Sequence, residues 1–367
     1  MQALILAGGE GTRLRPITST MPKPVVPLAN RPHLELMISW LRRHEVDEVI
    51  LSCGFLADGV REVLGTGERL GIPIRYVEEP VPLGTGGALR FAGDLLAERF
   101  FMLNGDVLTD IDLTAQLAQH DATGARATIA LIGVDDPSAY GLVRRHPDHS
   151  VSEFLEKPSP DQIDTNLVNA GAYILDRSIL EQMPAPGSNI SIERDVFPKL
   201  VGQGLFGFAS DGYWIDIGTP GRYLQGTFDI LEGNVATDVG DALEGARGVL
   251  ADGVALEGRA VAPVIIGQGG AVAASATVGG RAVLGRNVSV GPGSHIEDAV
   301  VLDGSTVGSG VRIRSAIIGP SVTIGDQCVI ESGAVVGQGV KLGAGNVLSA
   351  GARLFPGVEL PDGALRF

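Results

Sequence analysis

The stretch ATVGGRAVLGRNVSVGPGSHI, residues 276–296, carries an aliphatic side chain at every sixth position. The same period holds through the C-terminal third of the chain, apart from two five-residue steps, from Leu302 to Val307 and from Ile313 to Ile318. A glycine often follows the aliphatic residue, and a small or β-branched residue often stands four positions after it. Three hexapeptides build one triangular coil in hexapeptide solenoids, so the pattern predicts a parallel β-helix of roughly six coils. We expect the aliphatic side chains to point into the prism and the glycines to form its tight corners.

The preceding residues, 1 to about 233, have a different pattern, in which short apolar runs alternate with amphipathic stretches. This alternation predicts an α/β domain with a Rossmann-like, mostly parallel sheet, and ligands of such sheets bind beyond the carboxyl ends of the strands. We assign residues 1–233 to this domain, 234–250 to a linker and 251–367 to the β-helix. The expected strands are 4–7, 48–52, 74–77, 100–103 and 127–132, and the expected helices are 34–44 and 87–98.

The composition limits the class of protein. A formal net charge of −15 argues against nucleic-acid binding, which favours a basic surface. The two cysteines, Cys53 and Cys328, are too few for a disulfide framework, and we expect both to be small buried side chains. The apolar run at 3–7 is too short to span a membrane, and no basic segment precedes it. We therefore expect a cytoplasmic protein that binds neither nucleic acid nor a membrane.

A Gly-rich turn follows the first expected strand, in the string LAGGEGTRLRP at 6–16, and PKP follows at 22–24. Backbone N–H groups in such a turn can converge on phosphate oxygens, and Arg13 and Lys23 can neutralise a triphosphate. The turn alone could be an ordinary connection between a strand and a helix. It lacks the third glycine of a dinucleotide fingerprint and the Gly-Lys-Ser/Thr of a P-loop. Taken whole, the string resembles the signature of the sugar nucleotidyltransferases.

This resemblance covers the whole chain and implies a reaction. A nucleoside monophosphate unit would pass from a nucleoside triphosphate to a sugar 1-phosphate, with Mg²⁺ as cofactor and pyrophosphate as the second product. The hexapeptide proteins that the C-terminal repeat resembles imply a left-handed β-helix, for which we expect a role in homo-oligomerisation or regulation.

The resemblance also assigns roles to residues. The catalytic residues would be Arg13, Lys23, Asp106 and Asp216, and the two aspartates would hold the metal. The nucleotide would contact Leu6, Ala7, Gly8, Gly9, Gly11, Thr12, Arg13, Lys23, Glu79, Pro82, Gly84, Thr85 and Asp106. The sugar phosphate would contact Gly105, Tyr140, Gly141, Glu156, Lys157, Asn169 and Gly171.

The residues give partial support of their own. Asp106 ends an apolar strand at the edge where ligands bind, although an aspartate there is also a common turn residue. Lys157 suits a phosphate as a point charge, although the pair Glu156-Lys157 alone could be an exposed ion pair. Guanine offers a ring N–H and an amine side by side, which one carboxylate can accept, whereas thymine and uracil lack that edge. Glu79 therefore favours a guanine nucleotide, although Glu78 could do the same or Glu79 could be a surface carboxylate.

Details such as PKP at 22–24 and SIERDVFP at 191–198 resemble the mannose-1-phosphate guanylyltransferases, so GTP and mannose 1-phosphate are the favoured substrates. A thymidylyl-, uridylyl- or adenylyltransferase acting on glucose 1-phosphate is the alternative. A non-catalytic regulatory homologue is disfavoured because the phosphate-binding and metal-binding residues are present. Acyl transfer is also disfavoured, because His295 is the only histidine of the solenoid and is expected at a surface corner.

Overall fold

The computed structural model describes residues 1–54, 56–251 and 253–366. Residues 252 and 367 of the expected β-helix lie outside the described residues. Contacts between residues group the chain into two compact units, Met1–Gly9 with Met37–Trp214, and Glu10–Leu36 with Ile215–Phe367. This grouping differs from the boundaries expected from the change in sequence pattern, and each unit is described by itself.

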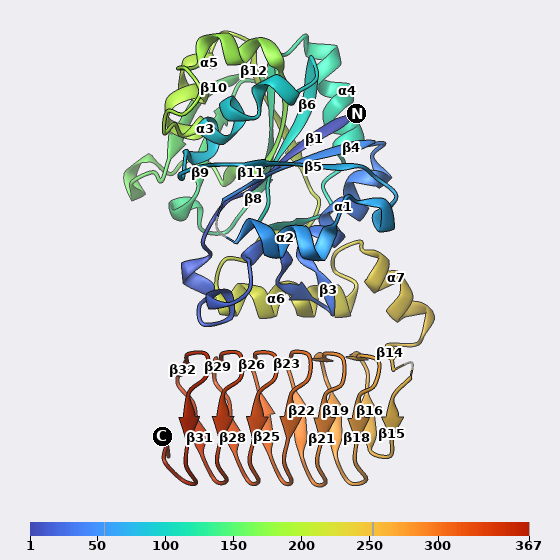
Figure 1. Cartoon of the computed structure of the whole chain (residues 1–367). Coiled ribbons are helices and arrows are strands. Elements are labelled where there is room, and N and C mark those ends of the chain that lie inside the picture. The colour runs from blue at the N-terminus through green and yellow to red at the C-terminus, as the bar shows by residue number, and fades with distance from the viewer. Residues whose placement is uncertain (55, 252, 367) are drawn as a thin grey trace. The chain divides into compact units, whose positions relative to one another are not determined.

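The first unit contains a sheet of nine strands among its described residues, with the order β10-β9-β11-β6-β1-β4-β5 and with β8 joining β11 to β12 (Figure 1). All five expected strands are present. The strands are β1 (Gln2–Ala7), β4 (Glu48–Cys53), β5 (Ile74–Glu78), β6 (Arg99–Asn104), β8 (Ala127–Gly133), β9 (Gly141–Arg145), β10 (Val151–Glu156), β11 (Leu167–Asp176) and β12 (Leu205–Ser210). A short strand, β7 (Val107–Thr109), follows β6.

This sheet is mixed, which corrects the expectation of a mostly parallel one. Strands β6, β1, β4 and β5 are parallel, as are β8 and β12. Strand β11 runs antiparallel to β6, β8 and β9, and β9 and β10 form an antiparallel pair. The apolar runs of β1 and β6 are almost completely buried, because both strands have neighbours on each side. The carboxyl ends of β1, β4 and β6 therefore lie side by side at one edge of the sheet.

Of the two helices expected from the sequence, the one at 34–44 is present as α1 and the other differs in its bounds. The helices are α1 (His33–Arg43), α2 (Ala57–Leu64), α3 (Gly84–Phe91), α4 (Leu113–Thr123) and α5 (Phe197–Leu200), of which α2, α4 and α5 were not expected. The helix expected at 87–98 begins earlier and ends at Phe91, and a 3-10 turn, Gly93–Leu95, follows it. Gly93 lies inside the expected range, where a glycine costs about 1 kcal/mol relative to alanine, and Leu96 is already extended.

The second unit begins with three 3-10 turns, Thr12–Leu14, Ile17–Ser19 and Lys23–Val25, and a two-stranded ribbon, β2 (Pro27–Leu28) and β3 (Arg31–Pro32). It continues with the short strand β13 (Trp214–Asp216), whose first residue belongs to the first unit, and with α6 (Pro220–Glu232). The stretch expected as a linker, 234–250, holds α7 (Asp238–Gly245) and β14 (Val249–Leu250), the first strand of the β-helix.

Three parallel sheets, with seven, seven and six strands among the described residues, form the β-helix (Figure 1). The first sheet holds β14, β17 (Val264–Ile266), β20 (Ala282–Leu284), β23 (Val300–Val301), β26 (Ile317–Ile318), β29 (Val335–Val336) and β32 (Arg353–Leu354). The second holds β15 (Ala255–Leu256), β18 (Ala271–Val272), β21 (Ser289–Val290), β24 (Thr306–Val307), β27 (Thr323–Ile324), β30 (Lys341–Leu342) and β33 (Glu359–Leu360). The third holds β16 (Arg259–Val261), β19 (Thr277–Gly279), β22 (His295–Glu297), β25 (Arg312–Arg314), β28 (Val329–Ile330) and β31 (Val347–Leu348).

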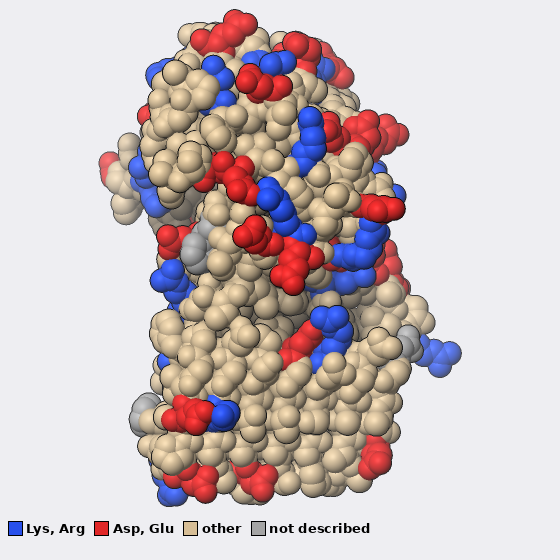
Figure 2. Space-filling view, in the orientation of Figure 1, with Lys and Arg blue, Asp and Glu red and all other residues tan. Residues whose placement is uncertain are grey.

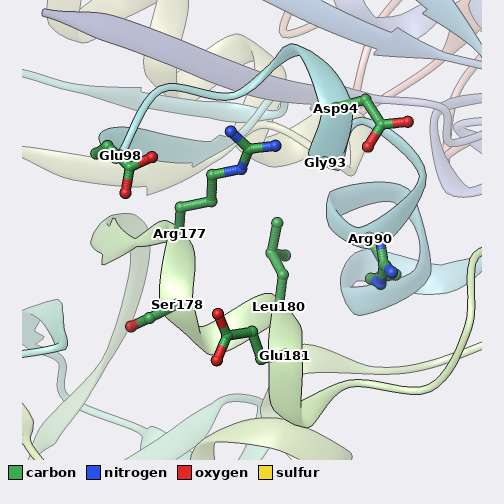
Figure 3. A pocket seen from close by; sticks show the side chains of 8 residues that line it. All are labelled: Arg90, Gly93, Asp94, Glu98, Arg177, Ser178, Leu180 and Glu181. Carbon is green, nitrogen blue, oxygen red and sulfur yellow. The ribbon is translucent and has the colours of Figure 1, made fainter.

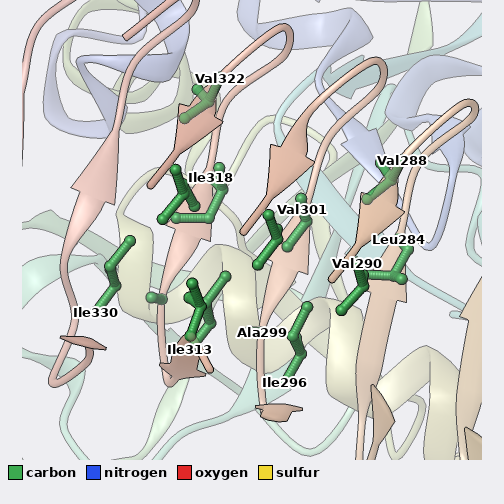
Figure 4. Close-up of a cluster of buried hydrophobic side chains, with 14 of the residues drawn as sticks. Leu284, Val288, Val290, Ile296, Ala299, Val301, Ile313, Ile318, Val322 and Ile330 are labelled. Atoms are coloured by element: carbon green, nitrogen blue, oxygen red, sulfur yellow. The ribbon is translucent and has the colours of Figure 1, made fainter. Parts of the chain in front are cut away.

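The interior of the prism corrects the sequence register at one place. Val301 pairs with Leu284 and Ile318 and belongs to the buried cluster inside the prism, together with Ala299 (Figure 4). The sequence pattern places Leu302 there instead. The first five-residue step therefore runs from Ile296 to Val301. A one-residue ambiguity arises here because the sequence offers three consecutive aliphatic residues, at 300–302.

The glycines that follow the inward aliphatic residues also have a different role from the one expected. Gly267 and Gly285 do not have the positive φ of a corner residue. A Cβ atom on Gly267 would lie 2.6 Å from the carbonyl carbon of Gly285, one coil further along. Close stacking of neighbouring coils therefore excludes a side chain at these positions. His295 lies in β22 and not at a corner, and its side chain is exposed, as expected.

Within the described ranges, no helix has the length and apolar character needed to cross a membrane. In the view of Figure 2, the face of the β-helix is mostly uncharged, whereas acidic and basic side chains are spread over the α/β part. Both cysteines are buried and unpaired, as the sequence predicts.

Candidate active site

The carboxyl ends of β1 and β6 bring together the residues expected to bind a nucleotide in the first unit. The backbone N–H of Gly105 donates to the carbonyl oxygen of Leu6 at 2.9 Å. A Cβ atom on Gly105 would lie 2.6 Å from that oxygen, so only glycine allows the contact. Asp106 is therefore fixed beside the end of β1, where Ala7 ends the strand and Gly8 begins the turn. A Cβ atom on Gly9 would meet nothing within 4 Å, so the turn is open there.

Glu79 follows β5 and lies against the same turn. The Ser52 hydroxyl donates to Oε1 at 2.9 Å, and the backbone N–H of Leu83 donates to Oε2 at 3.1 Å. A Cβ atom on Gly8 would lie 3.1 Å from Oε1. Glu79 thus holds its own loop, and each carboxylate oxygen retains the capacity to accept a second hydrogen bond.

The neighbouring Glu78 is used differently. Its Oε1 lies 2.5 Å from the Arg61 guanidinium, and both side chains are about half-exposed. Glu78 is thus engaged with Arg61, whereas Glu79 accepts from Ser52 and Leu83 beside Gly8. Between the two carboxylates that the sequence left open, the geometry favours Glu79 for ligand contact.

The residues expected to bind the sugar phosphate gather around β9, β10 and β11 in the first unit. A Cβ atom on Gly141 would lie 2.7 Å from the Phe154 ring and 3.0 Å from Glu156 Oε2, so glycine leaves the space that Glu156 occupies. Burial raises the pKa of Glu156, and the nearby Glu193 carboxylate raises it further. Lys157 is exposed, and its backbone N–H donates to the carbonyl oxygen of Tyr140 at 3.0 Å.

Asn169 is oriented by a buried tyrosine that the sequence did not single out. Its Nδ2 donates to the Tyr173 hydroxyl at 2.9 Å, and its Oδ1 accepts from the backbone N–H of Gly171 at 2.9 Å. Gly171 has φ +73°, and a Cβ atom there would lie 2.7 Å from Asn104 Nδ2. The sequence signal for Tyr173 was weak, because an aromatic residue in a buried strand is most often only part of the core.

Two aromatic rings form one wall of this region. The Tyr140 and Trp214 rings meet edge to face with centroids 5.3 Å apart, and Trp214 Nε1 donates to the Ala170 carbonyl at 2.7 Å. Trp214 thus fixes Tyr140 at the start of β9, directly before Gly141.

The start of α3 carries three residues expected at the nucleotide. The Pro82 carbonyl accepts from Asn189 Nδ2 at 3.0 Å. Gly84 has φ +73°, and a Cβ atom there would lie 2.6 Å from the Ile190 carbonyl oxygen. The Thr85 hydroxyl donates to Glu193 Oε2 at 2.7 Å and accepts from the Ile192 N–H at 2.9 Å. This loop is therefore joined to the segment 189–193, which the sequence did not connect with it.

In the second unit, cationic side chains surround Asp216. Arg13 lies 3.6 Å and Arg222 3.8 Å from Oδ2, and Lys23 lies 4.0 Å from Oδ1. The backbone N–H of Gly218 donates to Oδ1 at 2.7 Å. Lys23 and Asp216 are mostly buried, whereas the Arg13 side chain is 64% exposed. Arg222 was missed because no distinctive motif surrounds it in α6.

The turn between Arg13 and the first strand is shaped by one glycine. Gly11 has φ +62°, and a Cβ atom there would lie 2.9 Å from Lys23 Cβ. The turn Thr12–Leu14 starts directly after it. Glycine at this position allows the Gly-rich segment to pass close to Lys23.

Of the expected metal ligands, Asp106 lies in the first unit and Asp216 in the second. Over the described part of the chain, no group of three or more His, Cys, Asp or Glu side chains is arranged to hold a metal ion. Asp216 is a carboxylate, the kind of ligand that Mg²⁺ prefers, and its Oδ2 lies 3.6 and 3.8 Å from the Arg13 and Arg222 guanidinium groups, beyond hydrogen-bonding distance.

Residues 2–233 match the family described as Nucleotidyl transferase. The chain belongs to the nucleotidyl transferase family. Residues 250–348 match the left-handed β-helix domain of the EIF2B epsilon subunit, which agrees with the expected handedness.

Among relatives of this nucleotidyl transferase, the mannose-1-phosphate guanylyltransferase of Mycobacterium tuberculosis is 36% identical over 311 residues, 84% of this chain and 81% of the relative. Mannose-1-phosphate guanylyltransferase 1 of Arabidopsis thaliana is 35% identical over 314 residues, with the same coverage. The crystal structure of HddC from Yersinia pseudotuberculosis is 31% identical, covers 62% of this chain and 97% of its own, and has a TM-score of 0.54. HddC has also been solved in complex with GMP-PN, with 30% identity, the same coverage and a TM-score of 0.53.

The nucleotidyl transferase also has a cavity of about 430 Å³ away from the expected site residues (Figure 3). It is lined by Arg90, Gly93, Asp94, Glu98, Arg177, Ser178, Leu180 and Glu181. Acidic and basic side chains are mixed around it, and it contains none of the residues that the family resemblance assigns to substrates. It does not belong to the candidate active site.

Proposed function

We propose that this nucleotidyl transferase transfers GMP from GTP to mannose 1-phosphate, forming GDP-mannose and pyrophosphate. The observation that carries the choice of GTP is the Glu79 carboxylate, held at the carboxyl edge of the sheet against Gly8 by Ser52 and the Leu83 N–H. A carboxylate in that position can accept the paired donors of guanine. The two relatives above, both named as mannose-1-phosphate guanylyltransferases and covering 84% of this chain, support the choice of sugar.

In the proposed mechanism, a phosphate oxygen of the sugar 1-phosphate attacks the α-phosphorus of GTP in line, and the bond to pyrophosphate breaks. The nucleophile is already anionic, so no general base and no covalent intermediate are needed. Positioning and charge neutralisation then account for catalysis. Arg13, Lys23 and Arg222 would stabilise the negative charge of the triphosphate and of departing pyrophosphate, because they form a cationic group around Asp216.

Asp106 and Asp216 are the residues that we propose to hold Mg²⁺, which when bound would neutralise phosphate charge. In the sugar subsite, Lys157 would bind the phosphate, and Glu156 and Asn169 would accept and donate hydrogen bonds to hydroxyl groups. Tyr140 and Gly141 would shape the space for the ring, since a side chain at Gly141 would collide with Phe154 and Glu156.

The test measures pyrophosphate release by the full chain with Mg²⁺, using GTP, ATP, UTP or dTTP with mannose 1-phosphate or glucose 1-phosphate. We expect release mainly with GTP and mannose 1-phosphate. Preference for dTTP or UTP with glucose 1-phosphate would replace the assigned substrates but retain the reaction. No release with any pair would favour a non-catalytic regulatory homologue.

We also propose that the β-helix joins copies of this chain into a homo-oligomer. The mostly uncharged face of the β-helix in Figure 2 supports this, because flat, regular faces of this kind can pack together with little desolvation of charge. Light scattering of the full chain should give a mass that is a multiple of the 38.1 kDa monomer. A monomeric mass at micromolar concentration would contradict it.

We also propose that the chain divides into domains at 1–233, 234–250 and 251–367 and that the protein is cytoplasmic, as expected from the sequence. Limited proteolysis tests the boundaries, because cleavage within 234–250 should release two resistant fragments. Fractionation of the source cells tests the location.

A further inference from the structure

The segment Ile190–Phe197 has no role in the mechanism above, although it lies beside the proposed sugar subsite. The Ile190 carbonyl oxygen accepts from the N–H groups of Gly86 and Gly87 at 2.9 and 3.1 Å, and the Ile190 N–H donates to the Leu83 carbonyl at 2.9 Å. These contacts hold the segment against the start of α3.

The far end of the same segment is anchored to the strands that carry Glu156 and Asn169. The Phe197 ring lies between Phe154 of β10 and Tyr173 of β11, with ring centroids 5.5 and 5.2 Å away. Both aromatic partners are buried, so the segment is fixed at both ends. The residues between its two anchors therefore have a defined position relative to β10 and β11.

Glu193 lies between these anchors, and its carboxylate is oriented by two hydroxyl groups. The Thr85 and Ser191 hydroxyls both donate to Oε2, each at 2.7 Å. Among the described residues, no hydrogen bond is formed by Oε1. Glu193 is only partly buried, so part of the residue is accessible to a ligand. Two short hydrogen bonds on one oxygen leave the other as the free acceptor of a rigid side chain.

Glu193 also acts electrostatically on the sugar subsite. It raises the pKa of Glu156, second only to burial, and it contributes in the same direction to the raised pKa of the buried Tyr173. The segment Ile192–Val196, which carries Glu193, also contacts β10, the strand that ends at Glu156. The Tyr173 hydroxyl of the neighbouring region accepts from Asn169. Like charges at close range are costly unless hydrogen-bond donors are placed between them. A polyhydroxylated ligand provides such donors.

We propose that Glu193 is a specificity-determining residue of the sugar subsite, where its Oε1 accepts a hydrogen bond from a ring hydroxyl of the pyranose 1-phosphate. Glu156 and Glu193 then read two different hydroxyl groups of one sugar. This inference rests on the proposed function, since it assumes that a sugar 1-phosphate occupies the region around Glu156.

The test compares the wild-type enzyme and Glu193→Gln on mannose 1-phosphate and on its 2-, 3-, 4- and 6-deoxy analogues, with GTP held at saturation. We expect Glu193→Gln to lower kcat/KM for mannose 1-phosphate by about 10- to 100-fold, mainly through KM, because the ring hydroxyl of the sugar loses its charged acceptor. For the wild type, one deoxy analogue should lower kcat/KM about as much as Glu193→Gln does on mannose 1-phosphate. With the variant, that same analogue should cause little further loss of kcat/KM. KM for GTP should stay unchanged.

Glu181→Gln, an exposed carboxylate in the same unit, is the matched control and should behave as wild type. If Glu193→Gln does not fold, Ser191→Ala removes one of the two donors that orient the carboxylate and should show the same selective loss in weaker form. If every deoxy analogue lowered kcat/KM by the same factor in the wild type and in the variant, the proposal would be overturned and Glu193 would be a purely structural residue. An inactive wild type would be distinguishable, since the proposed function itself would then fail before any variant is compared.

Discussion

Arg13 and Asp216 form a loose ion pair, with 3.6 Å between Nη2 of the guanidinium and Oδ2, and the arginine side chain is 64% exposed. Such a pair contributes little to stability, because solvent screens it and the long side chain loses freedom when it is held. The same looseness leaves the guanidinium able to turn toward a phosphate. This agrees better with the role proposed for Arg13 at the phosphates than with a role in holding the fold.

The first prediction follows from this pair. Arg13→Gln should lower kcat/KM by about 100- to 1,000-fold, as expected for loss of a charged group that stabilises the transition state. Its melting temperature should remain close to that of the wild type. Arg286→Gln, which removes an exposed ion pair with Asp303 in the same unit, is the control and should keep full activity. Equal activity losses in both variants would contradict the role given to Arg13.

The second prediction concerns the base. Glu79→Gln should lower kcat/KM for GTP by about 10- to 100-fold relative to the other triphosphates, because an amide cannot accept two adjacent donors. The variant should also lose about 1 kcal/mol of stability, since its NH2 group cannot accept from Ser52 or Leu83. Glu78→Gln, which removes only the exposed pair with Arg61, should change neither property. Kinetics with competing triphosphates and urea unfolding measure both effects. An unchanged GTP preference in Glu79→Gln would remove the case for a guanine nucleotide.

The third prediction uses the raised pKa of Glu156, whose ordinary value is 4.5. Because burial and Glu193 favour the protonated form in the folded state, this group stabilises the fold fully below 4.5 and loses that contribution as pH rises through the raised pKa. At neutral pH, Glu156→Gln should therefore melt at a higher temperature than the wild type, and this difference should shrink below pH 4.5. A difference in melting temperature that is independent of pH would show that Glu156 is not the titrating group.

The fourth prediction tests the space beside Glu156. Gly141→Ala places a methyl group 2.7 Å from the Phe154 ring and 3.0 Å from Glu156, so it should cost about 1–3 kcal/mol and raise KM for the sugar phosphate. Gly221→Ala, at the start of α6, has no atom within 4 Å of the new methyl group and should be neutral or stabilising by up to about 1 kcal/mol. Unfolding curves of the two variants make the comparison. Equal stabilities would mean that β9 shifts to make room.

The fifth prediction concerns the thiols. Burial raises the pKa of Cys53 to about 12, and burial also raises the pKa of Cys328. The thiolate is the reactive form, so neither residue should be alkylated by iodoacetamide in the folded protein at mildly alkaline pH. Mass spectrometry should find both alkylated after unfolding. Rapid alkylation of the native protein would indicate that one of the two sites opens.

The sequence predicted five strands of the nine-stranded sheet and the β-helix, because burial on both faces and a six-residue period leave direct traces in the order of residues. It did not predict β9, β10, β11 and β12. It failed where neighbouring alternatives were chemically equal. Three aliphatic residues at 300–302 left the inward position undecided, and only pairing with Leu284 selects Val301. The antiparallel direction of β11 was also not visible, since strand direction depends on contacts far apart in the chain.

For the candidate site, motifs located the residues but not their partners. Thr85 was expected at the nucleotide, and the structure joins its hydroxyl to Glu193, more than a hundred residues away. Arg222 approaches Asp216 from a helix with no recognisable motif. Such contacts depend on tertiary packing, which no local pattern encodes.

The stacking of the β-helix has a further consequence. Val264 pairs with Ala282, eighteen residues later, whereas Val283 pairs with Val300, seventeen residues later, and each strand touches only the coils next to it. The length of this domain can therefore change only by whole coils. Loss or duplication of one whole coil would leave every remaining side chain facing the same way, whereas a single inserted residue within a strand would turn the following ones inside out. The domain can thus lengthen or shorten during evolution in units of a coil, while the residues that carry the chemistry stay untouched.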